Sequence, residues 1–361
     1  MKTRNLIGSA AATILGLLVL GIFVLSNFLS GNTPTTEPTP LPNNTSNSWY
    51  ALYFTQPEVT AKLSNPAGGL PTILTDSFAL AQQTLDVAIY EIDYQPYAEA
   101  LIAAHQRGVR VRVVTDSDYL SEEPMQAIRN AGIPVVADER DPFMHNKFVV
   151  IDNARVWTGS MNFTFSDAYR NNNGMLLIHS TRLAENYTAQ FEQMFTRRDF
   201  GQAINPPNPQ VTLSGTLIEN HFSPNGGVAA QILDVLRSAQ TSIRFMAFAF
   251  TREDFANVLI EKAQAGVTVQ GVFERRQVEA GSDGAWNLLS RAGLDVRQDG
   301  NTYNLHSKVF IVDSQIVVMG SYNFSRNAEE QNNENILIIH NADIAAAYEV
   351  EWQKVWLQAQ K

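Results

Sequence analysis

The sequence predicts an α/β protein made of two similar halves, and two observations support this fold class. The first is an internal repeat, in which Gly68-Gly69-Leu70 returns as Gly226-Gly227-Val228, 158 residues later. From Ala131-Gly132-Ile133 onward the offset becomes 161 residues, which places a three-residue insertion in the second copy. The second observation is the alternation of helix-like and strand-like hydrophobic patterns within each copy. Self-similarity at a fixed spacing indicates one structural unit used twice.

The elements of the first copy follow in order from these patterns. Short apolar runs predict buried strands, and apolar residues spaced three or four apart predict helices. We expect an amphipathic segment near 77–83, a strand at 86–92, a helix at 97–107, a strand at 109–115, a short helix at 124–131, strands at 148–152, 155–159 and 175–178, and a helix at 181–195. The second copy has the same order from residue 228 to 360. Strands separated by helices, together with the hairpin spacing of 148–159, predict a mixed β-sheet flanked by helices in each half.

The N-terminal segment, residues 1–30, predicts a transmembrane anchor. Lys2 and Arg4 precede an apolar run over residues 6–29, which is longer than the apolar part of a cleaved signal peptide and long enough to cross a bilayer. Because positive charges stay on the cytoplasmic side, we expect a single-pass protein of the cell membrane with an extracytoplasmic body. If the segment is cleaved, the body is secreted instead.

The rest of the chain divides by composition. Residues 31–48 are rich in Thr, Pro and Asn, which predicts an extended linker. We expect the first half at 49–200, a connector at 201–214 that contains Pro206, Pro207 and Pro209, and the second half at 215–361.

Charge and cysteine content exclude some classes of function. The chain has no cysteine, which excludes disulfides, thiolate nucleophiles and thiolate metal sites. Its net charge is -10, which argues mildly against dedicated nucleic-acid binding, because phosphate contacts need clustered basic residues.

One motif occurs once in each copy with identical spacing. The first copy has His145, Lys147, Asp152, Gly159, Ser160 and Asn162, and the second has His306, Lys308, Asp313, Gly320, Ser321 and Asn323. Imidazole acts as a nucleophile or a general acid, and an ammonium group neutralises phosphate charge. Serine and asparagine add short donors for phosphate oxygens. Two such sets facing each other would provide one group that attacks phosphorus and one that protonates the leaving oxygen.

These residues resemble the phospholipase D superfamily, whose signature is H-x-K-x4-D followed by G-S-x-N. The resemblance implies two α/β halves related by a pseudo-two-fold axis, which share one site without a metal or cofactor, and a phosphohistidine intermediate. It implies that His145 is the nucleophile and His306 the general acid. It also places Lys147, Lys308, Asn162 and Asn323 on the phosphate, with Ser160 and Ser321 beside them, and gives Asp152 and Asp313 orienting or structural roles in the catalytic set. A complete site in one chain means that a monomer is sufficient.

One position departs from the family pattern. The family places an acid after each G-S-x-N that hydrogen-bonds the histidine of its own half, and Glu334 fits this place in the second copy. Its counterpart in the first copy is Asn173, and an amide cannot stabilise an imidazolium as a carboxylate does. The reversed assignment, in which His306 attacks, therefore stays open.

The resemblance implies a phosphodiesterase that hydrolyses a phospholipid head group and leaves phosphatidic acid, with transfer to an alcohol as a related outcome. The anchor and the acidic charge favour the lipid. The alternative is a metal-independent endonuclease that acts on DNA or RNA. A non-catalytic binding module is a third reading, which the intact His and Lys pairs oppose. Phe143, Tyr303, Tyr322 and Phe324 flank the motifs and form either a wall of the site or part of the core.

Overall fold

The computed structural model describes residues 45–281 and 284–360. The predicted anchor and residues 31–44 of the predicted linker lie outside these residues. Within the described ranges, no helix is both long enough and apolar enough to cross a membrane.

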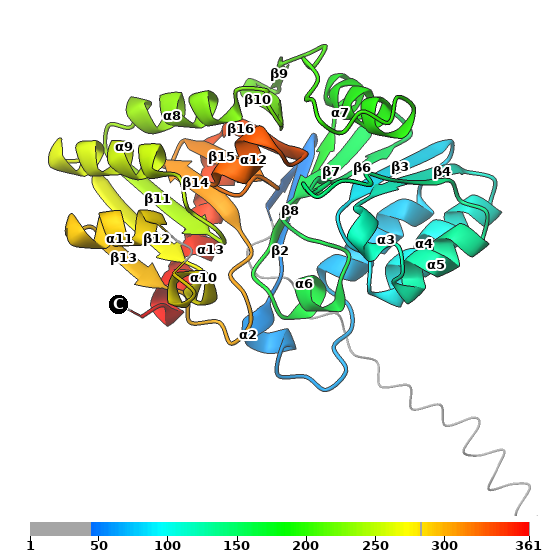
Figure 1. The fold of residues 1–361 in the computed structure, drawn as a ribbon, viewed down its shortest axis with the longest axis horizontal. Helices are drawn as coiled ribbons and strands as arrows, with labels where there is room; N and C mark the ends of the chain where they lie inside the picture. Colours follow the sequence, from blue (N-terminus) through cyan, green and yellow to red (C-terminus); the bar gives the residue numbers. More distant parts are fainter. Residues whose placement is uncertain (1–44, 282–283, 361) are drawn as a thin grey trace, which may run out of the picture. The chain divides into compact units, whose positions relative to one another are not determined.

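Two eight-stranded sheets with the same strand order form the body (Figure 1). The first sheet has the order β1-β2-β8-β7-β6-β3-β4-β5, and the second has the order β9-β10-β16-β15-β14-β11-β12-β13. In each sheet the three strands at one end are parallel and the other pairs are antiparallel. The prediction of two similar halves, each with a mixed sheet, is confirmed.

The strands of the first sheet are β1 (Thr45–Asn47), β2 (Tyr50–Phe54), β3 (Thr84–Ile89), β4 (Arg110–Thr115), β5 (Val135–Ala137), β6 (Lys147–Ile151), β7 (Arg155–Gly159) and β8 (Gly174–His179). Those of the second are β9 (Gln210–Leu213), β10 (Thr216–Ser223), β11 (Ser242–Ala247), β12 (Thr268–Phe273), β13 (Asp295–Gln298), β14 (Lys308–Val312), β15 (Ile316–Gly320) and β16 (Glu334–His340).

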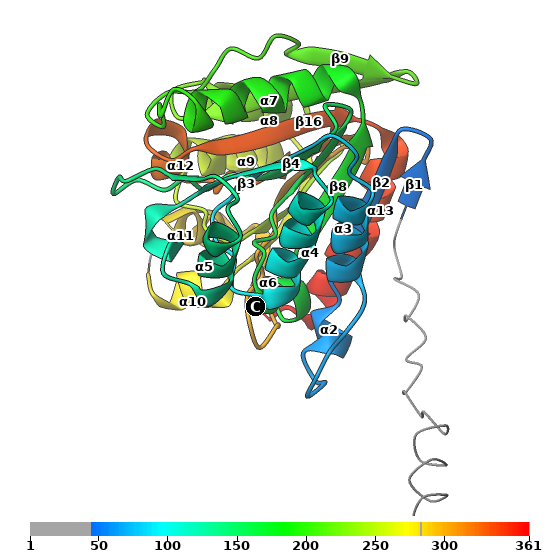
Figure 2. The same ribbon diagram turned by 90° about the vertical axis from the view of Figure 1, so that its right-hand side faces the viewer.

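Helices cover both faces of each sheet, with α7 (Thr181–Phe195) and α13 (Ala342–Gln358) on the inner faces (Figures 1 and 2). The first half has α2 (Pro57–Thr60), α3 (Leu70–Ala79), α4 (Gln95–Gln106), η1 (Ser117–Tyr119), α5 (Glu123–Asn130), α6 (Phe165–Tyr169) and α7 (Thr181–Phe195). The second has α8 (Val228–Ser238), α9 (Glu253–Gln264), α10 (Arg275–Glu279), α11 (Gly284–Arg291), α12 (Arg326–Glu330) and α13 (Ala342–Gln358). The outer core of the first half lies beneath α3, α4 and α5, and that of the second beneath α8, α9 and α11.

A central core joins the two halves. It combines residues of both sheets, such as Phe148 and Ile311, with residues of α7 and α13, such as Tyr187 and Trp352. Because this apolar surface belongs to both halves, burying it stabilises their association as well as each half.

The structure places one expected helix earlier in the chain and shows two short edge strands. The helix expected near 77–83 is α3, which begins earlier because Pro71 lies in its first turn after Gly69, a residue with φ of 71°. The expected linker and connector each end in a short edge strand, β1 and β9, which pairs with the next strand along the chain.

Candidate active site

Each motif histidine lies in a loop that leads into a central strand. Its backbone forms a hydrogen bond with the opposite half. The backbone N–H of His145 donates to the carbonyl oxygen of Asn333 at 3.0 Å, and that of His306 donates to Asn172 at 3.0 Å. Asn333 lies immediately before β16, and Asn172 lies two residues before the start of β8. The two halves therefore position each other's catalytic loops.

A buried carboxylate supports each of these loops from within its own half. Asp116, after β4, accepts the backbone N–H of Met144 at 3.0 Å, and Glu274, after β12, accepts that of Leu305. Burial raises the pKa of Asp116 to about 6. The sequence interpretation missed both acids, although they correspond at the 158-residue offset and each follows a predicted strand.

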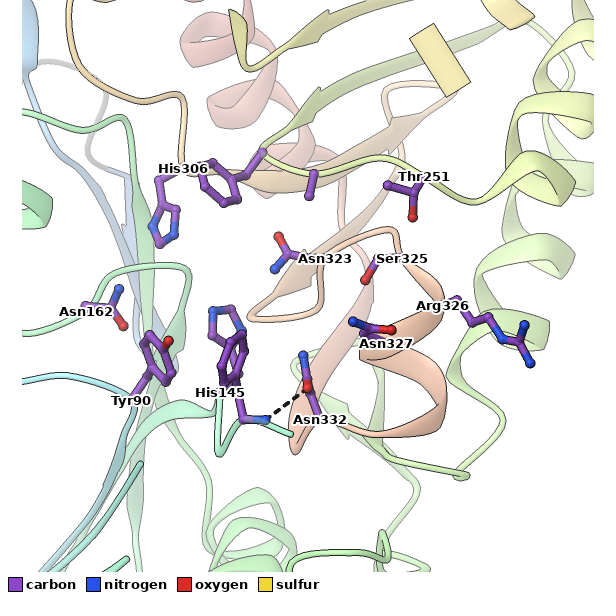
Figure 3. Close-up of a pocket in the computed structure, with 13 residues that line it drawn as sticks. Tyr90, His145, Asn162, Thr251, His306, Asn323, Ser325, Arg326, Asn327 and Asn332 are labelled. Atoms are coloured by element: carbon purple, nitrogen blue, oxygen red, sulfur yellow. Dashed lines mark hydrogen bonds between the residues drawn. The ribbon is translucent and has the colours of Figure 1, made fainter. Parts of the chain in front are cut away.

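The two imidazole rings point toward each other across one cavity of about 470 Å³ (Figure 3). Each ring packs edge-on against an aromatic ring, with centroids 5.0 Å apart for Tyr90 and His145 and 4.9 Å apart for Phe248 and His306. Figure 3 shows Asn162 and Asn323 on either side of the space between the rings. Residues of both motifs thus line the same cavity.

The motif lysines lie buried beside their histidines. Lys147 Nζ donates to the carbonyl oxygen of His145 at 2.9 Å, and Lys308 Nζ donates to that of His306 at 2.7 Å. Burial lowers the pKa of Lys147 to about 8. Burial and the charge of Lys147 lower the pKa of Lys308 to about 7. Two desolvated cations next to the cavity favour an anionic ligand.

His145 is paired with a carboxylate from the other half. Its Nδ1 lies 2.9 and 2.8 Å from the two carboxylate oxygens of Glu334, which is fully buried at the start of β16. The expectation that this acid binds the histidine of its own half is wrong. The reason is the bond from His145 to Asn333, which places the start of β16 against the first half's loop.

His306 has two polar partners in the first half. Its Nδ1 lies 3.1 Å from Asn173 Oδ1 and 3.3 Å from Asp167 Oδ1. Asp167 belongs to α6 and was not identified from the sequence. Its counterpart in the second half is Ala328, so this carboxylate is not part of the repeated motif.

Burial sets the protonation of both rings. It lowers the pKa of His145 well below the ordinary value, and Lys147 and Lys308 lower it further. It also lowers the pKa of His306 to about 4, against the opposing effect of Asp167. At neutral pH both imidazoles are therefore neutral. Burial also raises the pKa of Glu334 to about 8, against the charges of Lys147 and Lys308. When Glu334 is ionised it accepts Nδ1–H of His145 and leaves Nε2 available to a ligand, as the acceptors at Nδ1 of His306 do for that ring.

Asn162 and Asn323 line the cavity, as expected for groups that bind phosphate. The side-chain oxygens of both are buried and have no hydrogen-bond partner among residues 45–281 and 284–360. These oxygens can only accept hydrogen bonds, so the Nδ2 groups of the two asparagines are the donors that a phosphate oxygen would need.

Ser160 and Ser321 occupy a different place from the one expected. Neither lines the cavity: Ser160 Oγ donates to Asn173 Oδ1 at 2.8 Å, and Ser321 Oγ accepts the backbone N–H of Asn335 at 3.0 Å. The geometry thus corrects the expectation that they bind substrate directly. They instead hold the segments that carry the partners of the histidines.

Asp152 and Asp313, for which we expect orienting or structural roles, directly follow β6 and β14 and do not line the cavity. Asp152 accepts the backbone N–H groups of Gln82, Gln83 and Thr84, and Asp313 makes the equivalent bonds to residues 240–242. Both acids have positive φ in their hairpin turns. Their role is to fasten each turn to the loop before the neighbouring strand.

The glycines of the motif have a packing role. A Cβ atom at Gly159 would lie 2.1 Å from the carbonyl oxygen of Gly174, and one at Gly320 would lie 2.2 Å from that of Asn335. Any side chain at these positions would push the G-S-x-N segment away from the adjacent strand, which carries the histidine partners.

In the part of the chain that the structure describes, no group of three or more His, Cys, Asp or Glu could hold a metal ion.

A family model described as "Cardiolipin synthase, PLD-like domain" matches residues 74–195 and 232–356. The two matched segments contain the two motifs and cover most of the chain. The protein belongs to the phospholipase D-like family.

Two curated relatives support this assignment. The protein is 35% identical to a mitochondrial cardiolipin hydrolase of Xenopus laevis over 121 residues, which cover 33% of this chain and 58% of the relative. It is 29% identical to a phospholipase D of Rickettsia prowazekii (strain Madrid E) over 208 residues, which cover 56% of this chain and 99% of that protein. This phospholipase D-like chain thus matches a little over half the length of the first relative.

The fold also occurs in a solved structure. A phosphatidylserine synthase of Haemophilus influenzae Rd KW20 superimposes with a TM-score of 0.62 at 14% sequence identity, covering 80% of this chain and 84% of that one. At this identity the likeness concerns the arrangement of the phospholipase D-like halves.

The cavity of this phospholipase D-like protein is asymmetric. Beyond the two motifs it extends over the second half, where its lining consists of Ala249, Thr251, Ser325, Arg326, Asn327 and Asn332. In the first half the residues equivalent to Thr251 and Arg326 are Asp93 and Phe165, which do not line this cavity. Asp93 accepts the backbone N–H of Phe165, and the ring of Phe165 packs against Tyr94 and Tyr169.

The aromatic residues near the motifs divide between wall and core. Phe143 lines the cavity and is 39% exposed. Tyr322 and Phe324 are buried in the outer core of the second half. Tyr303 packs against Arg170.

Proposed function

We propose that this protein is a phosphodiesterase that hydrolyses the head-group phosphodiester of a phospholipid, leaving phosphatidic acid, through a phosphohistidine intermediate. The observation that carries the proposal is the pair of imidazoles that point toward each other across one cavity, each with its Nδ1 on an acceptor from the other half. Displacement at phosphorus needs one group to attack and one to protonate the leaving oxygen on the opposite side.

In the first step, His145 attacks. Glu334 accepts the Nδ1–H of His145, which leaves the Nε2 lone pair to form a bond to phosphorus. The bond from phosphorus to the head-group oxygen breaks, and His306 gives that oxygen its Nε2 proton. Glu334 then compensates the positive charge that develops on the phosphorylated ring.

His306 must hold a proton for this step. Its pKa is about 4 even with Asp167 beside it, because burial disfavours the charged ring. A phosphodiester between the rings brings a negative charge that raises the pKa, in the same direction as Asp167 does. Substrate binding and protonation of His306 are therefore coupled.

In the second step, water replaces the head group. The neutral His306 accepts a proton from the water as its oxygen bonds to phosphorus, and the phosphorus–nitrogen bond breaks. Phosphatidic acid leaves, and His145 returns to its neutral form. An alcohol in place of water would give a transferred phosphatidyl group by the same exchange of bonds.

Three observations support a lipid substrate. The relatives include proteins named cardiolipin hydrolase and phospholipase D. The net charge of -10 disfavours a polyanion such as nucleic acid. Phe143 exposes an apolar ring beside the cavity. The anchor predicted at residues 6–29 lies outside the described residues and would keep the body next to lipid at the cell membrane.

The test uses the full chain in detergent with EDTA, mixed with vesicles of phosphatidylcholine, phosphatidylglycerol or cardiolipin, and separately with plasmid and oligonucleotide. We expect phosphatidic acid from the unmodified protein and none from His145→Asn. The matched control is His179→Asn, which changes an exposed histidine outside the cavity and should retain full activity. Nucleic-acid cleavage with all lipids intact would overturn the lipid proposal and establish a nuclease.

A further inference from the structure

We propose that Asp167 is the positioning residue of His306, and that it replaces the carboxylate that the first half lacks at Asn173. The inference rests on the proposed function, in which His306 is the general acid. It concerns a residue that the motif does not contain.

The repeat shows that the two halves provide their carboxylates from different places. Glu334 and Asn173 occupy equivalent positions, as do Ala328 and Asp167. The half with an acid at the usual place has alanine on its short helix, and the half with an amide there has an acid on its short helix. Each half therefore still provides one carboxylate to the histidine of the other.

The surroundings of Asp167 suit a permanent negative charge. Its carboxylate accepts the backbone N–H of Asn162 at 2.7 Å, Asn171 Nδ2 at 2.7 Å and Asn173 Nδ2 at 3.1 Å, and its side chain is 2% exposed. Burial alone would raise the pKa of Asp167, but His306 and these donors hold it well below the ordinary value. The carboxylate thus remains charged beside His306 at neutral pH.

Asn173 occupies the position that Glu334 has in the second half, but as an amide it has a different role. Its Oδ1 receives both Ser160 Oγ and His306 Nδ1, while its Nδ2 donates to Asp167. The amide therefore links the ring to the acid and fixes the ring orientation, and Asp167 provides the charge.

The charges that face His306 set the expected pH effect. Asp167 is the anion that stabilises the imidazolium most, whereas Lys308 and Lys147 destabilise it, and the neutral His145 lies across the cavity. Removing the charge of Asp167 leaves the two cations unopposed at short range, so the proton of His306 should be lost at lower pH.

The test compares leaving groups. A head-group alkoxide needs a proton to leave, whereas p-nitrophenolate leaves unprotonated, so loss of general-acid catalysis should affect only the former. The full chain is tested with phosphatidylcholine in mixed micelles and with bis(p-nitrophenyl) phosphate, whose initial burst of p-nitrophenol reports the first step alone.

For Asp167→Asn we expect kcat on phosphatidylcholine to fall about 10- to 100-fold with little change in KM, an alkaline limb of the pH profile at lower pH, and a nearly unchanged burst. The matched variant Glu334→Gln should lose activity on both substrates, because it acts on the nucleophile. The double variant Asp167→Asn, Asn173→Asp moves the carboxylate to the usual place and should recover most of the lost kcat.

Two results would overturn the inference. One is an unchanged kcat in Asp167→Asn. The other is an equal loss on both substrates, which would mean that Asp167 acts on phosphate binding through Asn162 instead of on His306.

A second readout does not depend on turnover. The full chain is labelled with ¹⁵N-histidine, and the signal that is missing from the spectrum of His306→Asn identifies the ring of His306. Asp167→Asn should lower the pKa of this ring and should change the pKa of His145 less. If the unmodified protein cleaves neither diester, the proposed function fails. The pKa of His306 then decides this inference alone, and an unchanged value would refute it.

Discussion

Both carboxylate oxygens of Glu334 lie within 2.9 Å of His145 Nδ1, although the two residues belong to different halves. The reciprocal contacts run from His306 to Asn173 and Asp167. Neither half therefore contains a complete histidine site. The catalytic geometry depends on the interface between the halves, which the central apolar core stabilises.

Replacing Glu334 with glutamine tests this contact. The amide keeps a hydrogen-bond acceptor for Nδ1–H but cannot compensate the charge of a phosphorylated ring, so we expect kcat to fall about 10- to 100-fold. The measurement is steady-state kinetics on bis(p-nitrophenyl) phosphate. Glu279→Gln, at an exposed position on α10, is the matched control and should behave as the unmodified protein. Equal kcat values for the two variants would contradict the role of Glu334.

The buried lysines predict how phosphate binding depends on pH. Burial lowers the pKa of Lys147 to about 8 and that of Lys308 to about 7, so both are increasingly charged below these values and lose their protons as the pH rises through them. We expect the affinity for tungstate, a phosphate analogue, to decrease between about pH 7 and 9. Calorimetric titration at several pH values measures this change. In Lys308→Met the affinity should be lower throughout and less dependent on pH, and a constant affinity in the unmodified protein up to pH 9 would refute the prediction.

Asp152 should affect stability and not catalysis. Its carboxylate accepts three backbone N–H groups and pairs with Arg155, so Asp152→Asn should lower the free energy of unfolding by about 1–3 kcal/mol while kcat stays the same. These donors hold the pKa of Asp152 below its ordinary value, against the effect of burial. Because the pKa of Asp152 is lower in the folded state, its carboxylate adds to the free energy of unfolding above the pKa that it has in the unfolded chain. This contribution is lost as the pH falls through the pKa of the folded state.

Urea unfolding at pH 7 and at pH 3 checks this prediction. The difference between the unmodified protein and Asp152→Asn should be smaller at pH 3. A large loss of kcat in a variant that is still folded would instead return Asp152 to the catalytic set.

The asymmetric extension of the cavity should affect substrate choice. Thr251 and Asn327 line it in the second half, and neither belongs to the motif. We expect Thr251→Val and Asn327→Ala to raise KM for phospholipids severalfold and to leave the burst with bis(p-nitrophenyl) phosphate unchanged, because the small diester needs only the space between the histidines. Ser166→Ala, at the position equivalent to Asn327, is the control in the first half. Equal effects of the Ser166 and Asn327 substitutions would show that the extension does not contact substrate.

The sequence was sufficient for the fold class, and it named four motif residues that line the cavity. The repeat predicted two similar halves, because residues of equal type at a constant offset occupy equivalent positions in both sheets. The doubled motif likewise predicted the facing histidines, their lysines and the asparagines that line the cavity.

The remaining features depend on contacts between distant segments. The pairing of Glu334 with His145 follows from the interface between the halves, which no local pattern encodes. Asp167 has alanine as its counterpart, so comparing the copies could not reveal it. Ser160 and Asp152 have the expected spacing, but their side chains bond to neighbouring backbone and amide groups outside the cavity, and only the tertiary structure shows this.

The most direct test of the account is to trap the intermediate. The full chain is mixed with phosphatidylcholine, quenched in alkali during turnover, digested and analysed by mass spectrometry. We expect a phosphatidyl adduct on His145 of the unmodified protein. In His306→Asn mixed with bis(p-nitrophenyl) phosphate, whose leaving group needs no proton, an adduct on His145 should accumulate because the second step lacks its base. An adduct on His306, or turnover without any histidine adduct, would contradict the account.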